Sequence, residues 1–293
     1  MTELWQQSAV ELSRLFESKQ ASPREVLEAV QARLGTVNPL LNAVIATNWE
    51  AAFKEARASE ERLMRAERLG PLDGVPLTVK DNLYVSGFPA TWGSKLFDDF
   101  RPELDDIPVA RLRLAGAIIF GKTNTPEFAL APVTENLLFG KTRNPWNTNL
   151  TPGGSSGGAA AAVAAGMGSI ALATDGGGSI RRPASYTGLV GLKPSIGQVA
   201  RAHGFPSVAS DLQVIGPLAR TVADAELLFD CIRGASNLGR GGEPPRPQSS
   251  GARWPAWGPG PAAGASQAHV RPTATPESGV LRTTADSGRT GAD

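Results

Sequence analysis

The chain has 293 residues, of which 41% are hydrophobic and 19% charged, values typical of a globular protein with a sizeable core. Its formal net charge of +1 gives no electrostatic reason to expect a nucleic acid, an anionic membrane or an acidic substrate. The single cysteine, Cys231, excludes an internal disulfide and suits a reducing compartment, and its apolar neighbours favour a core position.

The first seventy residues are helical in pattern. Capping boxes at residues 8–11 and 22–25 predict two helix starts, and Asn48 predicts a third helix that runs towards Gly70. The first residues lack the pattern of a signal peptide, and the Ala-rich stretch at 159–173 is too short to span a membrane. We therefore predict a cytoplasmic location.

From Gly74 onwards, short apolar strands alternate with helices. We predict strands at residues 75–79, 117–120 and 170–173. We predict helices at residues 107–114, directly after residue 158, and at 222–232. This alternation favours a mixed α/β layer fold.

The composition changes near Ala235. Residues 236–293 contain no Lys, Ile or Phe, and Gly and Pro supply 18 of these 58 positions. Such a segment cannot bury enough apolar surface to offset its ordering entropy. We predict a domain at 1–235, with a helical lead-in at 1–70 and a catalytic core at 71–235, followed by a disordered tail at 236–293.

Histidine limits the chemistry that the chain can perform. There are two, and His269 lies in the predicted tail. A Ser-His-Asp triad, a Cys-His pair or a multi-histidine metal site would depend on His203 alone, so we expect none of them. A surface or loop histidine is the simpler interpretation of His203.

Residues 116–123 (GAIIFGKT) match the phosphate-binding P-loop pattern letter for letter. A P-loop needs a strand before its first glycine and a flexible loop between the two glycines. Here the four intervening residues are apolar and β-prone, so we predict a strand and no phosphate site.

Two glycine-rich segments remain. Residues 153–158 (GGSSGG) open into a predicted helix, and alone they fit a flexible turn, an anion-binding loop or a functional loop equally well. In the second segment, Gly176, Gly177 and Gly178 let successive backbone N–H groups turn towards one point, as an oxyanion hole requires. Ser179 follows them and is placed to attack the same carbonyl.

The base for such a serine has to be a group other than histidine. Lys80 is a candidate because it follows an apolar strand, and burial lowers the pKa of a lysine into the range of a working base. Taken alone, this segment fits a surface lysine better.

Together and in this order, the segments resemble the amidase signature family. The matching stretches are residues 74–82, 121–128, 153–158, 174–185 and 188–194. The resemblance implies Ser179 as the nucleophile, Lys80 as the general base, and Ser155, after a cis peptide bond, as the residue that relays the proton. It also implies an oxyanion hole formed by the backbone N–H groups of residues 176–179.

The implied fold is a mixed β-sheet core flanked by helices on both faces. The implied activity is hydrolysis of a carboxamide C–N bond through a serine acyl-enzyme, without a cofactor or metal and with a small-molecule amide as substrate. Direct nucleic-acid or membrane contact is not expected. Family members continue well beyond residue 235, so we expect a truncated form whose C-terminal half is absent or replaced.

Two alternatives stay open. The chain can be a glutaminase-type component of a tRNA amidotransferase that delivers ammonia to partner subunits. It can also be an inactive fragment or a binding module, for which an exposed sheet edge predicts homo-oligomers. The sequence does not distinguish among these, and it does not identify the amide.

Overall fold

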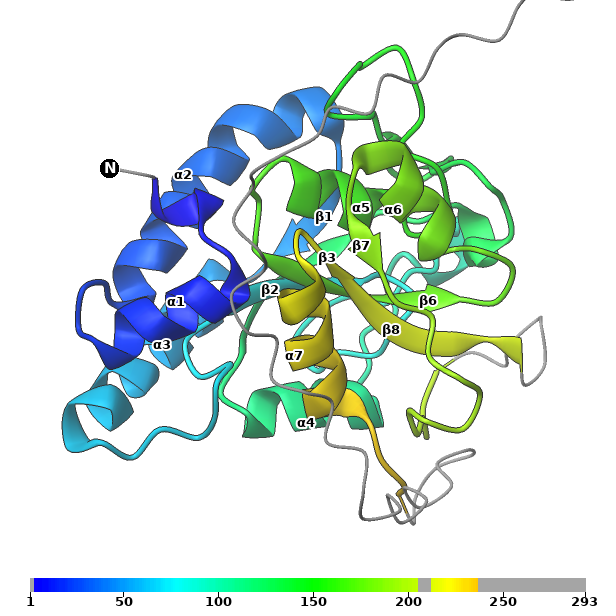
Figure 1. The fold of residues 1–293 in the computed structure, drawn as a ribbon. Coiled ribbons are helices and arrows are strands. Elements are labelled where there is room, and N and C mark those ends of the chain that lie inside the picture. Colours follow the sequence, from blue (N-terminus) through cyan, green and yellow to red (C-terminus); the bar gives the residue numbers. More distant parts are fainter. Residues whose placement is uncertain (1–2, 205–211, 237–293) are drawn as a thin grey trace, which may run out of the picture. The chain divides into compact units, whose positions relative to one another are not determined.

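The computed structural model describes residues 3–204 and 212–236 (Figure 1). The disorder predicted for the tail concerns residues that, apart from Ser236, lie outside the described part of the chain, as does His269.

A six-stranded mixed sheet forms the centre of the fold, in the strand order β1-β3-β2-β6-β8-β7 (Figure 1). Strand β2 pairs in parallel with β3 and β6, and the other pairs are antiparallel. The carboxyl ends of β2 and β6 therefore lie side by side at one edge of the sheet. The strands are β1 (Val44–Thr47), β2 (Pro76–Lys80), β3 (Ile118–Thr123), β6 (Ile170–Asp175), β7 (Val190–Gly191) and β8 (Val214–Ala219).

Helices cover both faces of this sheet, which confirms the predicted fold class. Helices α1, α4 and α7 pack on one face, and α2, α3, α5 and α6 on the other. The α-helices are α1 (Ala9–Glu17), α2 (Pro23–Leu41), α3 (Trp49–Arg65), α4 (Ile107–Leu114), α5 (Gly157–Ala164), α6 (Arg181–Thr187) and α7 (Val222–Ile232). Short elements complete the described part: the 3₁₀ turns η1 (Leu4–Gln6), η2 (Lys95–Phe97) and η3 (Glu127–Ala129), and the hairpin β4 (Glu135–Asn136) and β5 (Gly140–Lys141).

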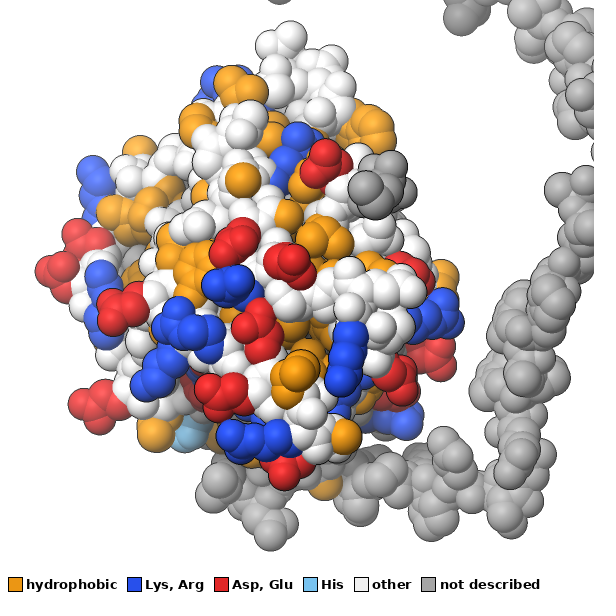
Figure 2. All heavy atoms as spheres, turned by 90° about the vertical axis from the view of Figure 1, so that its left-hand side faces the viewer, with side chains coloured by type: hydrophobic (Ala, Val, Ile, Leu, Met, Phe, Trp, Pro, Cys, Tyr) orange, Lys and Arg blue, Asp and Glu red, His pale blue; other side chains and the backbone are white. Residues whose placement is uncertain are grey.

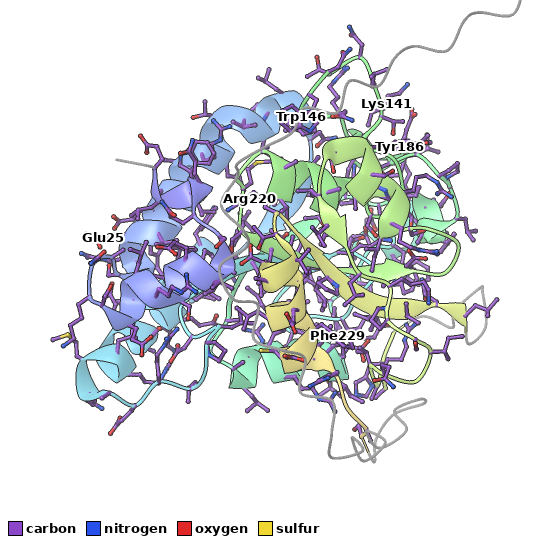
Figure 3. The ribbon with its side chains drawn as sticks, viewed as in Figure 1. Glu25, Lys141, Trp146, Tyr186, Arg220 and Phe229 are labelled. Atoms are coloured by element: carbon purple, nitrogen blue, oxygen red, sulfur yellow. The ribbon has the colours of Figure 1, made fainter. Side chains whose placement is uncertain are left out.

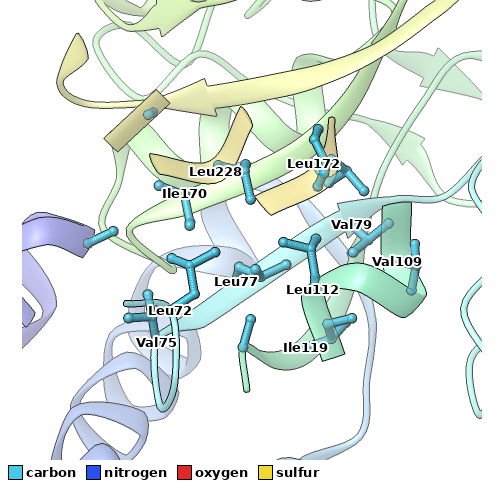
Figure 4. Packing of buried hydrophobic residues seen from close by; sticks show 14 of the residues in the cluster. Leu72, Val75, Leu77, Val79, Val109, Leu112, Ile119, Ile170, Leu172 and Leu228 are labelled. Carbon is cyan, nitrogen blue, oxygen red and sulfur yellow. The ribbon is translucent and has the colours of Figure 1, made fainter. Parts of the chain in front are cut away.

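Alternate residues of the central strands point to opposite faces, as the pleat of a strand dictates. Leu77 of β2 and Ile170 of β6 pack against Leu228 of α7 in the largest apolar cluster (Figure 4). Ala171 and Ala173 of β6 point to the other face, towards α5. The sheet is thus buried on both sides, which is why its parallel strands are apolar throughout.

Helix α5 lies very close to the sheet because its first six residues are only glycine and alanine. A Cβ atom on Gly158 would come 2.4 Å from the backbone nitrogen of Asn124 and 2.8 Å from the carbonyl oxygen of Ala43. The start of α5, and the serine pair just before it, is therefore held against the end of β3.

Most predicted elements are present, with shifted ends. Ser22 and Glu25 form the predicted capping box, and Asn48 caps α3. Helix α3 ends at Arg65 rather than near Gly70, because Ala66 adopts a left-handed conformation. Residues 118–123 of the P-loop-like segment form β3, as predicted.

Strands β1, β7 and β8 were not predicted. Strands β1 and β7 have only four and two residues, too few to show a period. Strand β8 contains Gly216 and Pro217, residue types that sequence patterns assign to turns.

The side of the molecule that carries α1–α3 shows positive and negative side chains intermixed (Figure 2). This pattern agrees with the near-zero net charge of the chain. Within residues 3–204 and 212–236, no helix has the length and apolar character to cross a membrane.

The close approach of α5 generates a stability prediction. Gly158→Ala should strongly destabilise the fold, because the added methyl group meets backbone atoms that cannot move aside. Gly35→Ala is the matched control: it lies within α2 with nothing within 4 Å of the added Cβ, and should stabilise by about 0.5–1 kcal/mol. Thermal unfolding of both variants checks this, and equal melting temperatures would contradict it.

Candidate active site

Lys80 is the last residue of β2 and is completely buried. Its Nζ atom donates hydrogen bonds to Oγ of Ser155 at 2.6 Å and to Oγ1 of Thr174 at 3.0 Å. Burial lowers the pKa of Lys80 to about 7, although the charges of Asp175 and Asp81 act in the opposite direction. The structure thus excludes the surface-lysine interpretation and supplies an amine that is partly neutral at neutral pH.

Ser155 lies in the loop before α5 and is 1% exposed. The Gly154–Ser155 peptide bond is cis, as the resemblance implies. A Cβ atom on Gly154 would come 2.8 Å from the carbonyl oxygen of Ala131 and from the backbone nitrogen of Val133. The segment 131–133 therefore leaves room only for glycine before Ser155.

The loop that leads to Ser155 is fastened to α6. Nε1 of Trp146 donates to the carbonyl oxygen of Thr187 at 2.8 Å, and Nδ2 of Asn144 donates to that of Tyr186 at 3.0 Å. Figure 3 shows Trp146 and Tyr186 close together beside α6. These contacts fix the approach of the chain to the glycine–serine loop.

Ser156 ties this loop to the end of β6. Its Oγ donates to the carbonyl oxygen of Thr174 at 3.1 Å, and its backbone N–H donates to that of Ser179 at 3.2 Å. Nδ2 of Asn82 donates to Oγ1 of Thr174 at 3.0 Å, so this hydroxyl accepts from both Asn82 and Lys80. The structure thus brings the loops of Ser155 and Ser179 together beside Lys80.

The sequence analysis missed the contributions of Asn82, Thr174 and Ser156. Each is a polar residue that lies close in the sequence to a predicted site residue. Their type was visible in the sequence, but the pairing of β2 with β6 that brings them together was not.

Ser179 lies in the turn between β6 and α6 and is partly exposed. Of the predicted oxyanion-hole donors, Gly178 is already engaged: its N–H donates to Oδ1 of Asp175 at 2.8 Å. Gly178 has a φ of +108°, a conformation that strongly favours glycine. The turn therefore depends on a glycine at this position, with its N–H directed at a carboxylate.

Asp175 organises the turn around Ser179. Its carboxylate accepts from Gly178, from the N–H of Ile180 at 3.1 Å, and from Nε and Nη2 of Arg181 at 3.0 and 2.9 Å. Burial alone would raise the pKa of Asp175, but these donors hold it well below its ordinary value. Asp175 therefore stays charged and positions the turn rather than acting as a base.

Lys122, from the P-loop-like segment, has a structural task. It is buried in β3, and its Nζ donates to the carbonyl oxygens of Leu83, Pro89 and Asp81 at 2.7, 2.9 and 3.2 Å. Burial lowers its pKa to about 8. It anchors the loop that follows Lys80, and the strand around it has no phosphate-binding loop.

His203 and Cys231 lie outside this cluster. The backbone N–H of His203 donates to Asp106 at the start of α4. Cys231 is partly buried in α7, and burial raises the pKa of its thiol to about 11, so it is a poor nucleophile. Within the described residues, no group of His, Cys, Asp or Glu side chains is arranged to hold a metal ion.

Comparison with known proteins agrees with this geometry. A family model described as Amidase matches residues 25–250. The chain is 46% identical to the GatA-type component of glutamyl-tRNA(Gln) amidotransferase from Acidothermus cellulolyticus, over 80% of this chain and 46% of that protein. It is also 46% identical to the corresponding protein from Carboxydothermus hydrogenoformans, over 79% of this chain and 48% of that protein.

Solved structures give the same result. The fold is similar to that of a bacterial aryl acylamidase, with a TM-score of 0.76 and 37% identity over 81% of this chain and 50% of that one. It is similar to the peptide amidase from Stenotrophomonas maltophilia, with a TM-score of 0.75 and 35% identity over 79% of this chain and 49% of that one. The chain spans about half the length of the curated relatives it matches. By fold, motifs and sequence, this chain belongs to the amidase signature family.

Proposed function

We propose that this chain is an amidase that hydrolyses the C–N bond of a small carboxamide through a serine acyl-enzyme, releasing ammonia or an amine. The observation that carries the proposal is the 2.6 Å hydrogen bond between Nζ of buried Lys80 and Oγ of Ser155. With a pKa of about 7, Lys80 is partly neutral at neutral pH, and a neutral amine can accept a proton.

In the first half-reaction, neutral Lys80 keeps one N–H on Thr174 and turns its lone pair to Ser155. Ser155 passes its proton to Lys80 and takes the proton of Ser179, whose Oγ attacks the carbonyl carbon of the amide. A tetrahedral oxyanion forms. The proton then returns through Ser155 to the leaving nitrogen, the C–N bond breaks, and the acyl group stays on Ser179.

The second half-reaction reverses these roles with water. Water loses a proton through Ser155 to Lys80 and attacks the acyl carbon, and the carboxylic acid leaves as Ser179 regains its proton. We assign the oxyanion to the backbone N–H groups of Gly176, Gly177 and Ser179. Gly178 is left out because its N–H is engaged by Asp175.

A second candidate is a glutaminase that delivers ammonia to partner subunits. The relatives at 46% identity carry the name of an amidotransferase component, which favours this candidate. Ammonia release from glutamine, measured beside amine release from a simple anilide, separates the two. Turnover of the anilide alone supports the independent amidase, and turnover of glutamine alone supports the amidotransferase component. Both candidates retain the predicted cytoplasmic location.

The assembled site can be tested with a fluorophosphonate probe, which reacts with activated serines. The wild-type chain should be labelled and Ser179→Ala should not. Lys80→Met should slow labelling by roughly 10²–10⁴-fold, the contribution of a general base. Absence of labelling in soluble, folded wild-type protein would contradict the proposal and favour an inactive fragment or binding module.

The pH dependence follows from the lowered pKa of Lys80. Below about pH 7 the amine is protonated and cannot accept a proton, so the labelling rate should fall about tenfold per pH unit and level off above that value. Lys141→Met, which removes an exposed lysine, should leave the profile unchanged. A rate that keeps rising to pH 10 would show that Lys80 has an ordinary pKa.

A further inference from the structure

We propose that Arg182 is a positioning residue that holds the loop of Ser155 and the loop of Ser179 in register; this inference rests on the proposed function of the two serines. Nη1 of Arg182 donates to the carbonyl oxygen of Gly154 at 3.0 Å, and Nη2 donates to that of Gly177 at 3.1 Å. One guanidinium group thus bridges two segments that lie 28 and 5 positions away along the chain.

The first of these carbonyls belongs to the peptide unit that enters Ser155. Gly154 has no side chain that could fix the orientation of this unit, and space for one is absent. The hydrogen bond from Arg182 holds its carbonyl oxygen, and with it the direction in which Ser155 leaves the loop.

The second carbonyl belongs to the peptide unit between Gly177 and Gly178. Its oxygen accepts from Arg182, and its N–H donates to the carboxylate of Asp175. The unit therefore lies with its negative end on a cation and its positive end on an anion. A flipped unit would direct its carbonyl oxygen at Asp175, which is unfavourable. Arg182 and Asp175 together fix how the neighbouring peptide units present their N–H groups.

A guanidinium group suits this task because its planar fork directs two N–H donors at two separate oxygens. The ammonium of a lysine is a single point of charge on a flexible stem. Ser156 also connects the two loops, through Thr174 and Ser179. Loss of Arg182 should therefore loosen the site without unfolding the protein.

The neighbouring arginine has a different partner, which separates the two roles. Arg181 pairs with the Asp175 carboxylate, whereas Arg182 contacts only backbone oxygens among the described residues. Arg182→Ala consequently removes a bridge between loops and leaves the charge balance of Asp175 intact.

The test compares Arg182→Ala and Arg182→Lys with the wild-type chain by the rate of fluorophosphonate labelling. Arg182→Ala should be slower by about 10- to 100-fold, the effect of losing charge-assisted hydrogen bonds. Arg182→Lys should recover only a small part of the rate, while added ethylguanidinium ion should restore part of it in Arg182→Ala. The pH at which the rate levels off should not move, because Lys80 keeps its surroundings.

Arg111→Ala is the matched control, because Arg111 also donates to backbone oxygens, those of Ile232, Gly234 and Ala235. It should label at the wild-type rate. Labelling of Arg182→Ala within twofold of wild type, or an equal loss in Arg111→Ala, would overturn the proposal.

Amide hydrogen exchange provides a readout that does not depend on activity. In Arg182→Ala, peptides that cover residues 153–158 and 174–182 should exchange about tenfold faster, while those of α1–α3 should not change. If wild-type protein is not labelled but exchange rises in both loops, the proposed function fails and the bridging role stands. Unchanged exchange in either loop would overturn the role of Arg182 whatever the labelling shows.

Discussion

The burial of one lysine amine without a carboxylate in direct contact is the constraint on which the site depends. Lys80 is completely buried, and its Nζ contacts two neutral hydroxyls. The nearby carboxylates have other partners: Asp175 is bound by Arg181 and backbone N–H groups, and Asp81 accepts from Thr91 and from Gly93. With its charge uncompensated at contact distance, the amine favours its neutral form. A neutral amine beside a serine hydroxyl is what a histidine-free serine mechanism requires.

The fold produces this environment by placing Lys80 at the end of a strand that has neighbours on both sides. Strand β2 lies between β3 and β6, and the sheet is covered on both faces. Parallel pairing with β6 brings Thr174 to the same edge, and the close approach of α5 brings Ser155. Glycine and alanine are needed in α5 because any larger side chain would push the loop of Ser155 away from the amine. Stability and chemistry thus depend on the same small residues.

The fold class and the central strands could be predicted because strand and helix periods are local. The residues Lys80, Ser155 and Ser179 could be named from their motifs, and the structure brings the loops that carry them together. The supporting residues could not be predicted so well. Thr174 joins Lys80 only through the register of two strands that lie far apart in the sequence, and Arg182 only through the shape of two glycine loops. Three glycines predict a convergence of N–H groups, but not that the N–H of Gly178 points to Asp175 instead.

The most direct measurement is the pKa of the Lys80 amine itself, followed by NMR titration of its ¹⁵Nζ resonance and assigned by its loss in Lys80→Met. The account predicts a midpoint at about 7, because burial outweighs the charges of Asp175 and Asp81. A midpoint near the ordinary value of 10.5 would contradict it, because Lys80 would then stay protonated at neutral pH and could not activate Ser179 through Ser155.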